Sequence, residues 1–315
     1  MAGDNSGPGP DGVPNIANNG LKTNIAIWCL FVLATVFLLL RLYSKGRRPR
    51  RGFWWDDYVL VFAWVGILTL IITSIPVMIA NGFGMPGKYL DAKQTYRVGL
   101  GGLVAGTMMI LATTGSKTSF ILTLVRISTG PQLTAALCVA AVSMNLCHIA
   151  TILLQWLQCQ PLEKAWHRLP AGTCLPSRVN LGMAMASTAY SGVIDLSLAI
   201  ASWFVVSSLQ IRKTERIGIA LVMSMGVFAA ITAFIKVPLL TLMASSDFSY
   251  SHAQDEGANL LILSSTEITF TIMAASLPML RTLVREFDGC KAKGSTQGPG
   301  RFEDLQLQRR TPAGG

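Results

Sequence analysis

The sequence predicts an all-α protein, a bundle of seven helices that cross a membrane. Hydrophobic residues make up 51% of the 315 residues and charged residues only 13%, whereas soluble domains carry about a quarter charged residues. The mean hydropathy is +0.48. Seven apolar stretches each reach the roughly 20 residues that a helix needs to cross the hydrocarbon core. Lipid offers no partners to backbone polar groups, so these stretches are predicted to be helices.

The predicted spans follow one another with mostly short polar connections. In order they are Asn24–Tyr43, Asp57–Ala80, Val98–Ile127, Leu133–Leu157, Leu181–Leu209, Ile217–Met243 and Asn259–Leu280. Pro238 and Pro278 fall inside the last two spans, where we expect them to kink the helices.

Polar segments flank the predicted membrane domain, which covers residues 24–285. Residues 1–23 are rich in Gly, Pro and Asn, and residues 286–315 are polar and Gly-rich. We expect both segments to be disordered, since neither has the apolar residues to build a core. The first segment lacks the basic start and cleavage site of a signal peptide, so the first span is expected to be retained.

The positive charges are distributed unevenly between the two sides of the predicted bundle. The net charge is +10, and one side carries 17 Lys and Arg residues against seven on the other. The positive-inside rule therefore predicts an outside N-terminus and a cytosolic C-terminus. Asp56, Asp57 and Arg126 are then expected at the cytosolic membrane edge. This distribution fits topology and attraction to anionic lipid, and it argues against nucleic-acid binding.

Two cysteines stand in the loop between the fourth and fifth spans. The topology places Cys159 and Cys174 on the oxidising outer side, where we predict a disulfide. It would close a loop of about 16 residues and contribute about 3 kcal/mol by restricting the unfolded chain. We predict no metal site, because two thiols are too few and no pair of His residues stands at ligand spacing.

Four ionisable residues lie deep inside the spans, where charge is costly and often functional. Lys236 and Glu267 lie seven and eight residues from the outer ends of adjacent helices, which puts both about 10–12 Å below the outer surface. We predict that they form a buried ion pair. Asp195 is expected near the midplane and Lys117 in the inner half, with a stem long enough to reach Asp195 or the cytosolic face.

Two interpretations of these four residues remain open. Buried pairs can simply fix the register of helices, because an unpartnered charge would be expelled from the bundle. Alternatively, Lys117, Asp195, Lys236 and Glu267 form a polar core that contacts a ligand or substrate.

Several short motifs occur in a fixed order along the spans. They are Asp56-Asp57-Tyr58, Gly82-x-Gly84, Lys117-x-Ser119, Leu124-x-Arg126, Cys159-x-Pro161 with Trp166 and Cys174, Asp195, and Glu267 with Ser276-Leu277-Pro278. With them, residues 24–285 resemble the fungal rhodopsin-like integral membrane family, which includes satratoxin-cluster membrane proteins and receptor-like proteins linked to host sensing. The resemblance implies seven helices and a role in a secondary-metabolite cluster or in sensing.

The chain departs from the pattern of this family and of the retinal proteins at particular positions. Met85-Pro86 stands where the family usually has a His, and Lys236 replaces an Arg. Retinal attachment needs a Lys on the last helix, but Asn259–Leu280 contains none, so we expect neither retinal nor another cofactor.

Three functions remain open at this stage. A receptor-like sensor would bind a lipophilic small molecule from outside and act on a cytosolic signalling partner. A membrane-embedded enzyme or accessory factor would use Asp195 and Glu267 as general acids on a lipophilic intermediate. An exporter is less well supported, because no inverted repeat is visible. We identify no catalytic motif, and we expect the plasma membrane or an internal secretory-pathway membrane.

Overall fold

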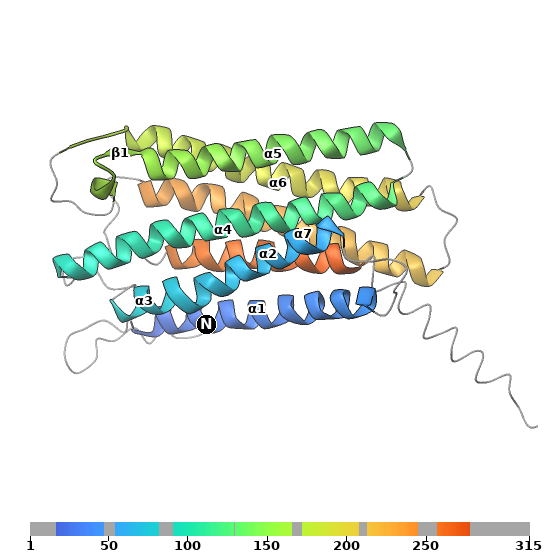
Figure 1. Ribbon diagram of the computed structural model, residues 1–315, viewed down its shortest axis with the longest axis horizontal. Coiled ribbons are helices and arrows are strands. Elements are labelled where there is room, and N and C mark those ends of the chain that lie inside the picture. Colours follow the sequence, from blue (N-terminus) through green and yellow to red (C-terminus); the bar gives the residue numbers. More distant parts are fainter. Residues whose placement is uncertain are drawn as a thin grey trace, which may run out of the picture.

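The computed structural model describes residues 17–46, 54–81, 91–128, 130–165, 172–207, 213–244 and 257–277. Within these residues, seven helices are long and apolar enough to cross a membrane. The long helices run side by side along a common direction, and Figure 1 shows the β1 segment at one end of the bundle. The predicted multi-pass membrane fold is confirmed.

The helices follow the predicted order. The long helices are α1 (Ala17–Gly46), α2 (Trp55–Thr69), α4 (Ala92–Ile127), α5 (Pro131–Leu157), α6 (Ser177–Ser207), α7 (Lys213–Ala244) and a final helix, Gly257–Leu277. The second span continues from α2 through a π-helical turn, η1 (Leu70–Ser74), into α3 (Ile75–Ala80).

Several helices extend beyond the predicted spans. The first helix begins at Ala17 instead of Asn24, so residues 17–23 do not belong to a disordered segment. The third long helix, α4, begins at Ala92 instead of Val98. A hydropathy pattern marks the part of a helix that matches the lipid core, whereas the helix itself can continue into the polar boundary. Residues 1–16 and 278–315, which include Pro278 and the predicted C-terminal segment, lie outside the described residues.

Small residues allow two pairs of helices to approach closely. A Cβ added at Gly226 of α7 would lie 3.0 Å from the Cβ of Ala199 in α6. A Cβ added at Gly115 of α4 would lie 3.0 Å from that of Ala63 in α2. In lipid, where apolar burial does not drive association, such close packing is a main source of helix–helix stability. These contacts fix α6 on α7 and α2 on α4.

A short hairpin caps one end of the bundle. Strand β1 (Cys159–Gln160) pairs antiparallel with β2 (Thr173–Cys174), with Cys159 opposite Cys174. The two cysteines form the predicted disulfide, which confirms that expectation. The 3₁₀ turn η2 (Leu162–Ala165) follows β1, and Trp166 lies outside the described residues.

Candidate functional site

Four charged side chains meet inside the bundle. The Nζ of Lys117 lies 2.8 Å from Oδ2 of Asp195 and 2.6 Å from Oε1 of Glu267. Lys236 pairs with the other carboxylate oxygen of Glu267. We call Lys117, Asp195, Lys236 and Glu267 the central ion network. In their ordinary charge states the two lysines and two carboxylates balance, which is the arrangement that buried charge requires.

A serine ties the central ion network together. The hydroxyl of Ser191 accepts a hydrogen bond from the ammonium group of Lys117 and donates one to Oε1 of Glu267 at 3.1 Å. Ser191 also offers its backbone carbonyl to Lys117 at 3.1 Å. Lys117 and Glu267 are each 0% exposed. Each charge therefore has partners that offset the cost of removing it from water.

The sequence places each member of this network on a different helix, namely α4, α6, α7 and the final helix. The expected pairing of Lys236 with Glu267 is present. Of the two directions considered for Lys117, the structure has the one toward Asp195. The additional contact between Lys117 and Glu267 was not anticipated, because depth along each helix says nothing about which faces turn inward.

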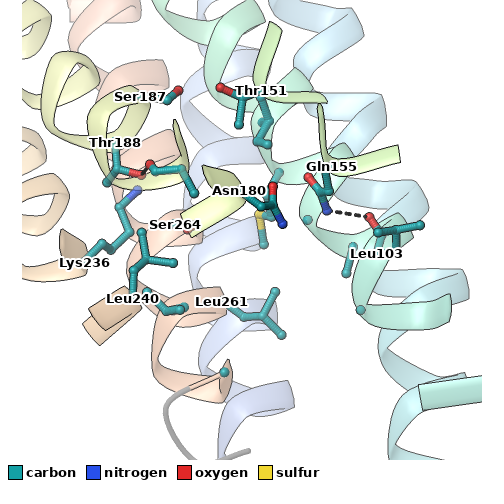
Figure 2. Close-up of a pocket in the computed structure, with 18 of the residues that line it drawn as sticks. Leu103, Thr151, Gln155, Asn180, Ser187, Thr188, Lys236, Leu240, Leu261 and Ser264 are labelled. Atoms are coloured by element: carbon teal, nitrogen blue, oxygen red, sulfur yellow. Dashed lines mark hydrogen bonds between the residues drawn. The ribbon is translucent and has the colours of Figure 1, made fainter. Parts of the chain in front are cut away.

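A cavity of about 740 Å³ lies between the helices beside this network. Its wall is formed by α4, α5, α6, α7 and the final helix together with Met78 of α3, and Lys164 and Ala165 of the hairpin lie at one end. Figure 2 shows Lys236, Thr188 and Ser264 on one side of the cavity, with Gln155 and Leu103 across from them. Cavities of about 300–1,000 Å³ hold drug-sized ligands.

The central ion network lies next to the inner end of the cavity. Thr113 lines the cavity one helical turn before Lys117, and Ser264 lines it about one turn before Glu267. Ser191 and Lys236 line the cavity themselves, whereas the cavity wall does not include Lys117, Asp195 or Glu267. A molecule in the cavity thus contacts the network through Ser191 and Lys236.

Four further buried polar side chains line the cavity. Thr113, His148, Thr151 and Ser187 are 7%, 5%, 6% and 4% exposed. Nδ1 of His148 lies 2.7 Å from the hydroxyl of Thr114. Among the described residues, we find no hydrogen-bond partner for the hydroxyl of Thr113 or of Ser187. Neither hydroxyl oxygen is fully buried, and an unpaired hydroxyl on a cavity wall is available to a cavity occupant.

A second charged cluster lies toward the end of the bundle opposite the hairpin. Nε of Arg41 donates to Oδ1 of Asp57 at 3.0 Å, and its Nη2 lies 2.5 Å from Oδ2 of Asp56. Nζ of Lys45 lies 2.5 Å from Oδ2 of Asp57. We call Arg41, Lys45, Asp56 and Asp57 the α1–α2 cluster. It too balances two positive and two negative groups.

Arg41 links the α1–α2 cluster to the rest of the bundle. Its guanidinium group donates to the hydroxyl of Thr123 in α4 at 3.0 Å and to the carbonyl of Ala275 in the final helix. Ser119 of α4 donates to the backbone carbonyl of Asp56 at 2.6 Å. The five donors of a guanidinium group lie in one rigid plane, so Arg41 fixes the mutual positions of four helices.

Arg41 and Lys45 are two of the 17 Lys and Arg residues counted on the predicted cytosolic side, but they do not lie in a connecting loop. Both lie in α1, and Arg41 is 0% exposed. Asp56 and Asp57, expected at a membrane edge, are 5% and 2% exposed and fully engaged in ion pairs. The sequence did hold a signal for this cluster. Asp56 and Asp57 at the start of one helix follow Arg41 and Lys45 near the end of the preceding helix after a short connection.

Arg126 lies near the same end of the bundle. It stands in the last turn of α4 and is exposed, with its guanidinium carbon 4.6 Å from the ring centroid of Trp54. This is a cation–π contact. Arg126 therefore makes its own contact with the start of the second span.

A model of the fungal rhodopsin domain matches residues 40–286. The chain belongs to the fungal rhodopsin family. A comparison with curated proteins gave no match. The family match includes the central ion network and the cavity, and it begins one residue before Arg41. In this member, the described part of the final helix, Gly257–Leu277, contains no Lys for a retinal Schiff base. Among the described residues, no group of three or more His, Cys, Asp and Glu side chains is placed to hold a metal ion.

Proposed function

We propose that this fungal rhodopsin family member is a receptor-like sensor that binds a lipophilic small molecule in the cavity. The observation that carries the proposal is the contact between the cavity and the charge-balanced network through Ser191 and Lys236. A ligand that prefers one arrangement of these side chains shifts the bundle toward that arrangement.

Two helices, α4 and the final helix, connect the central ion network with the α1–α2 cluster. Lys117 and Thr123 lie six residues apart on α4, about 9 Å along the axis. Glu267 and Ala275 lie eight residues apart on the final helix, about 12 Å along the axis. Lys117 and Glu267 belong to the central ion network, and Thr123 and Ala275 contact Arg41. Movement of either helix at the cavity therefore acts on the α1–α2 cluster.

The sidedness and context of the sensor are part of the proposal. The hairpin end faces outside, the α1–α2 cluster faces the cytosol, and a cytosolic signalling partner reads the change. The gene belongs to a secondary-metabolite gene cluster, or the protein acts in a sensing pathway. Sequencing of the neighbouring genes tests whether it belongs to such a cluster.

An enzyme that uses Asp195 and Glu267 as general acids has less support. A general acid must come within hydrogen-bond reach of the reacting group. Neither carboxylate belongs to the cavity wall, and both are paired with Lys117. A cavity occupant instead meets an ammonium group and hydroxyls, which suit recognition.

The experiment uses two matched glycine substitutions. A Cβ added at Gly102, which lines the cavity, meets no heavy atom within 4 Å, and the same holds at the exposed Gly182 of α6. Gly102→Leu places a bulky side chain in the cavity, where its Cβ meets no neighbour, and should strongly reduce the transcriptional response to the ligand in the native cell. Gly182→Leu adds the same side chain outside the cavity and should respond normally.

Glu267→Gln distinguishes the three candidate functions. A sensor loses its transcriptional response while pathway chemistry continues. An enzyme loses product and accumulates one precursor, and an exporter traps product inside the cell. A normal response in both Gly102→Leu and Glu267→Gln would refute the sensor.

A further inference from the structure

We infer that the ligand is an uncharged lipophilic molecule with a carbonyl or comparable oxygen acceptor, which binds at the ammonium group of Lys236. The inference rests on the proposed function and specifies the chemistry of the molecule that the cavity accepts. It follows from the charge balance, the donors and the apolar wall at the inner end of the cavity.

The charge balance excludes ionic ligands. Lys117, Lys236, Asp195 and Glu267 pair among themselves, and in their ordinary charge states they carry no net charge. An anionic ligand at Lys236 would compete with Glu267 and leave one buried negative charge without a cation. A cationic ligand would face two buried ammonium groups. Either uncompensated charge is costly in surroundings from which water is excluded.

The ammonium hydrogens of Lys236 favour a ligand that carries a hydrogen-bond acceptor. An ammonium group has three hydrogens and no lone pair. Among the described residues, Glu267 is the one hydrogen-bond partner of Lys236, and Lys236 is 8% exposed on the cavity wall. Its remaining hydrogens can be satisfied within the cavity only by an oxygen or nitrogen lone pair. A carbonyl oxygen offers two lone pairs and no charge.

The hydroxyls of Thr113 and Ser187 also favour a ligand that carries oxygen atoms. Both are buried on the cavity wall, and the described residues offer them no partner. Hydroxyls donate and accept, so they suit a second oxygen on the ligand, either carbonyl or hydroxyl.

The rest of the ligand is apolar. Between the inner polar groups and the hairpin, the wall includes apolar side chains such as Met78, Leu103 and Leu261, and Gly102 leaves space there. Polar side chains such as Gln155 and Asn180 interrupt this wall. Such a wall suits a ring system or chain without charges. At the hairpin end, Lys164 already donates to the carbonyl of Gly172.

The test uses the full chain in lipid nanodiscs with four pyrenes that differ in one group. They are 1-acetylpyrene, 1-ethylpyrene, pyrene-1-carboxylic acid and 1-pyrenemethylamine. Binding is measured by energy transfer from protein tryptophans, and the signal from Gly102→Leu nanodiscs is subtracted to remove partitioning into lipid. Gly182→Leu serves as the matched control that retains the cavity.

We expect 1-acetylpyrene to bind about tenfold more tightly than 1-ethylpyrene, the gain expected of a hydrogen bond from a charged donor. The acid and the amine should bind no better than 1-ethylpyrene. Lys236→Met should abolish the tenfold difference while 1-ethylpyrene still binds, which also reports that the variant is folded.

A second measurement avoids the variant at Lys236. With 1-acetylpyrene labelled with ¹³C at the carbonyl, the infrared carbonyl stretch should lie at lower frequency in wild type than in Gly102→Leu. An unshifted carbonyl band would overturn the inference.

The outcomes separate this inference from the proposed function. If 1-ethylpyrene binds in a manner that Gly102→Leu abolishes, but the ketone has no advantage or the acid binds best, the ligand class is wrong and the binding cavity stands. If Gly102→Leu changes the binding of none of the four, the cavity does not take such ligands, and both proposals fall.

Discussion

Lys117 of α4 and Glu267 of the final helix are joined twice, by a direct contact of 2.6 Å between Nζ and Oε1 and through the hydroxyl of Ser191. Glu267 also pairs with Lys236, whereas within the described part of the chain Asp195 forms an ion pair only with Lys117. Glu267 is therefore the member of the central ion network that neutralises both lysines. This asymmetry leads to the first two predictions.

Glu267→Gln should destabilise the protein more than Asp195→Asn. Removing Glu267 leaves two buried lysines with one carboxylate and should cost about 3–5 kcal/mol. Removing Asp195 leaves Lys117 paired with Glu267 and should cost less. Thermal unfolding in detergent, followed by size-exclusion chromatography, gives the order. Equal losses for the two variants would contradict the geometry.

Exchanging the charges of one pair should restore stability only in part. Lys236→Glu and Glu267→Lys should each lower expression strongly, since each leaves like charges buried together. In the double variant the pair is restored with reversed sign, but the new lysine faces Lys117, which lies 2.6 Å from Glu267 in the native chain. Membrane expression should therefore fall between that of the single variants and wild type. A double variant worse than both singles would mean that the pair contributes nothing.

Arg41→Lys should be strongly destabilising although it keeps the charge. A lysine cannot reproduce the planar set of donors that reaches Asp56, Asp57, Thr123 and the Ala275 carbonyl. Loss of several buried hydrogen bonds should cost about 2–3 kcal/mol. Arg126→Lys is the matched control, because Arg126 is exposed and stacks on Trp54; its cost should stay below about 1 kcal/mol. Thermal unfolding compares the two, and similar losses would rule out the bridging role of Arg41.

Removing the disulfide should lower stability by about 3 kcal/mol. The bond joins residues separated by 15 positions, and the cost follows from the freedom that the unfolded chain regains. Cys159→Ser, Cys174→Ser and the double variant should unfold at the same lower temperature, because each of them removes the same bond. A double variant more stable than the singles would instead point to harm from an unpaired thiol.

The two ends of the chain should lie on opposite sides of the membrane, since the described residues contain seven candidate spans, an odd number. Small epitope tags at each end, probed in intact and permeabilised cells, test this expectation. Only the N-terminal tag should be reached in intact cells. Access to both tags, or to the C-terminal tag alone, would contradict the proposed orientation.

The sequence was sufficient for the number and order of the membrane helices, because span length and apolar composition are set by the bilayer. Depth arithmetic also predicted that Lys236 and Glu267 pair, since they lie at similar depth on adjacent helices. It could not assign Lys117 to Glu267 or place Arg41 among Asp56, Asp57 and Thr123. Those contacts depend on the rotation of each helix about its axis, which the hydropathy pattern leaves undetermined when most residues are apolar.

The π-helical turn at Leu70–Ser74 determines which way the side chains that follow it in the second span point around the helix axis. A wide turn of this kind behaves as if one residue had been added to an otherwise regular helix. In a regular helix one residue corresponds to about 100° of rotation. Met78 lies beyond this turn, beside Gly101 of α4 and on the cavity wall. A chain shortened by one residue in this turn would rotate Met78 away from α4 and open the cavity toward the surrounding lipid.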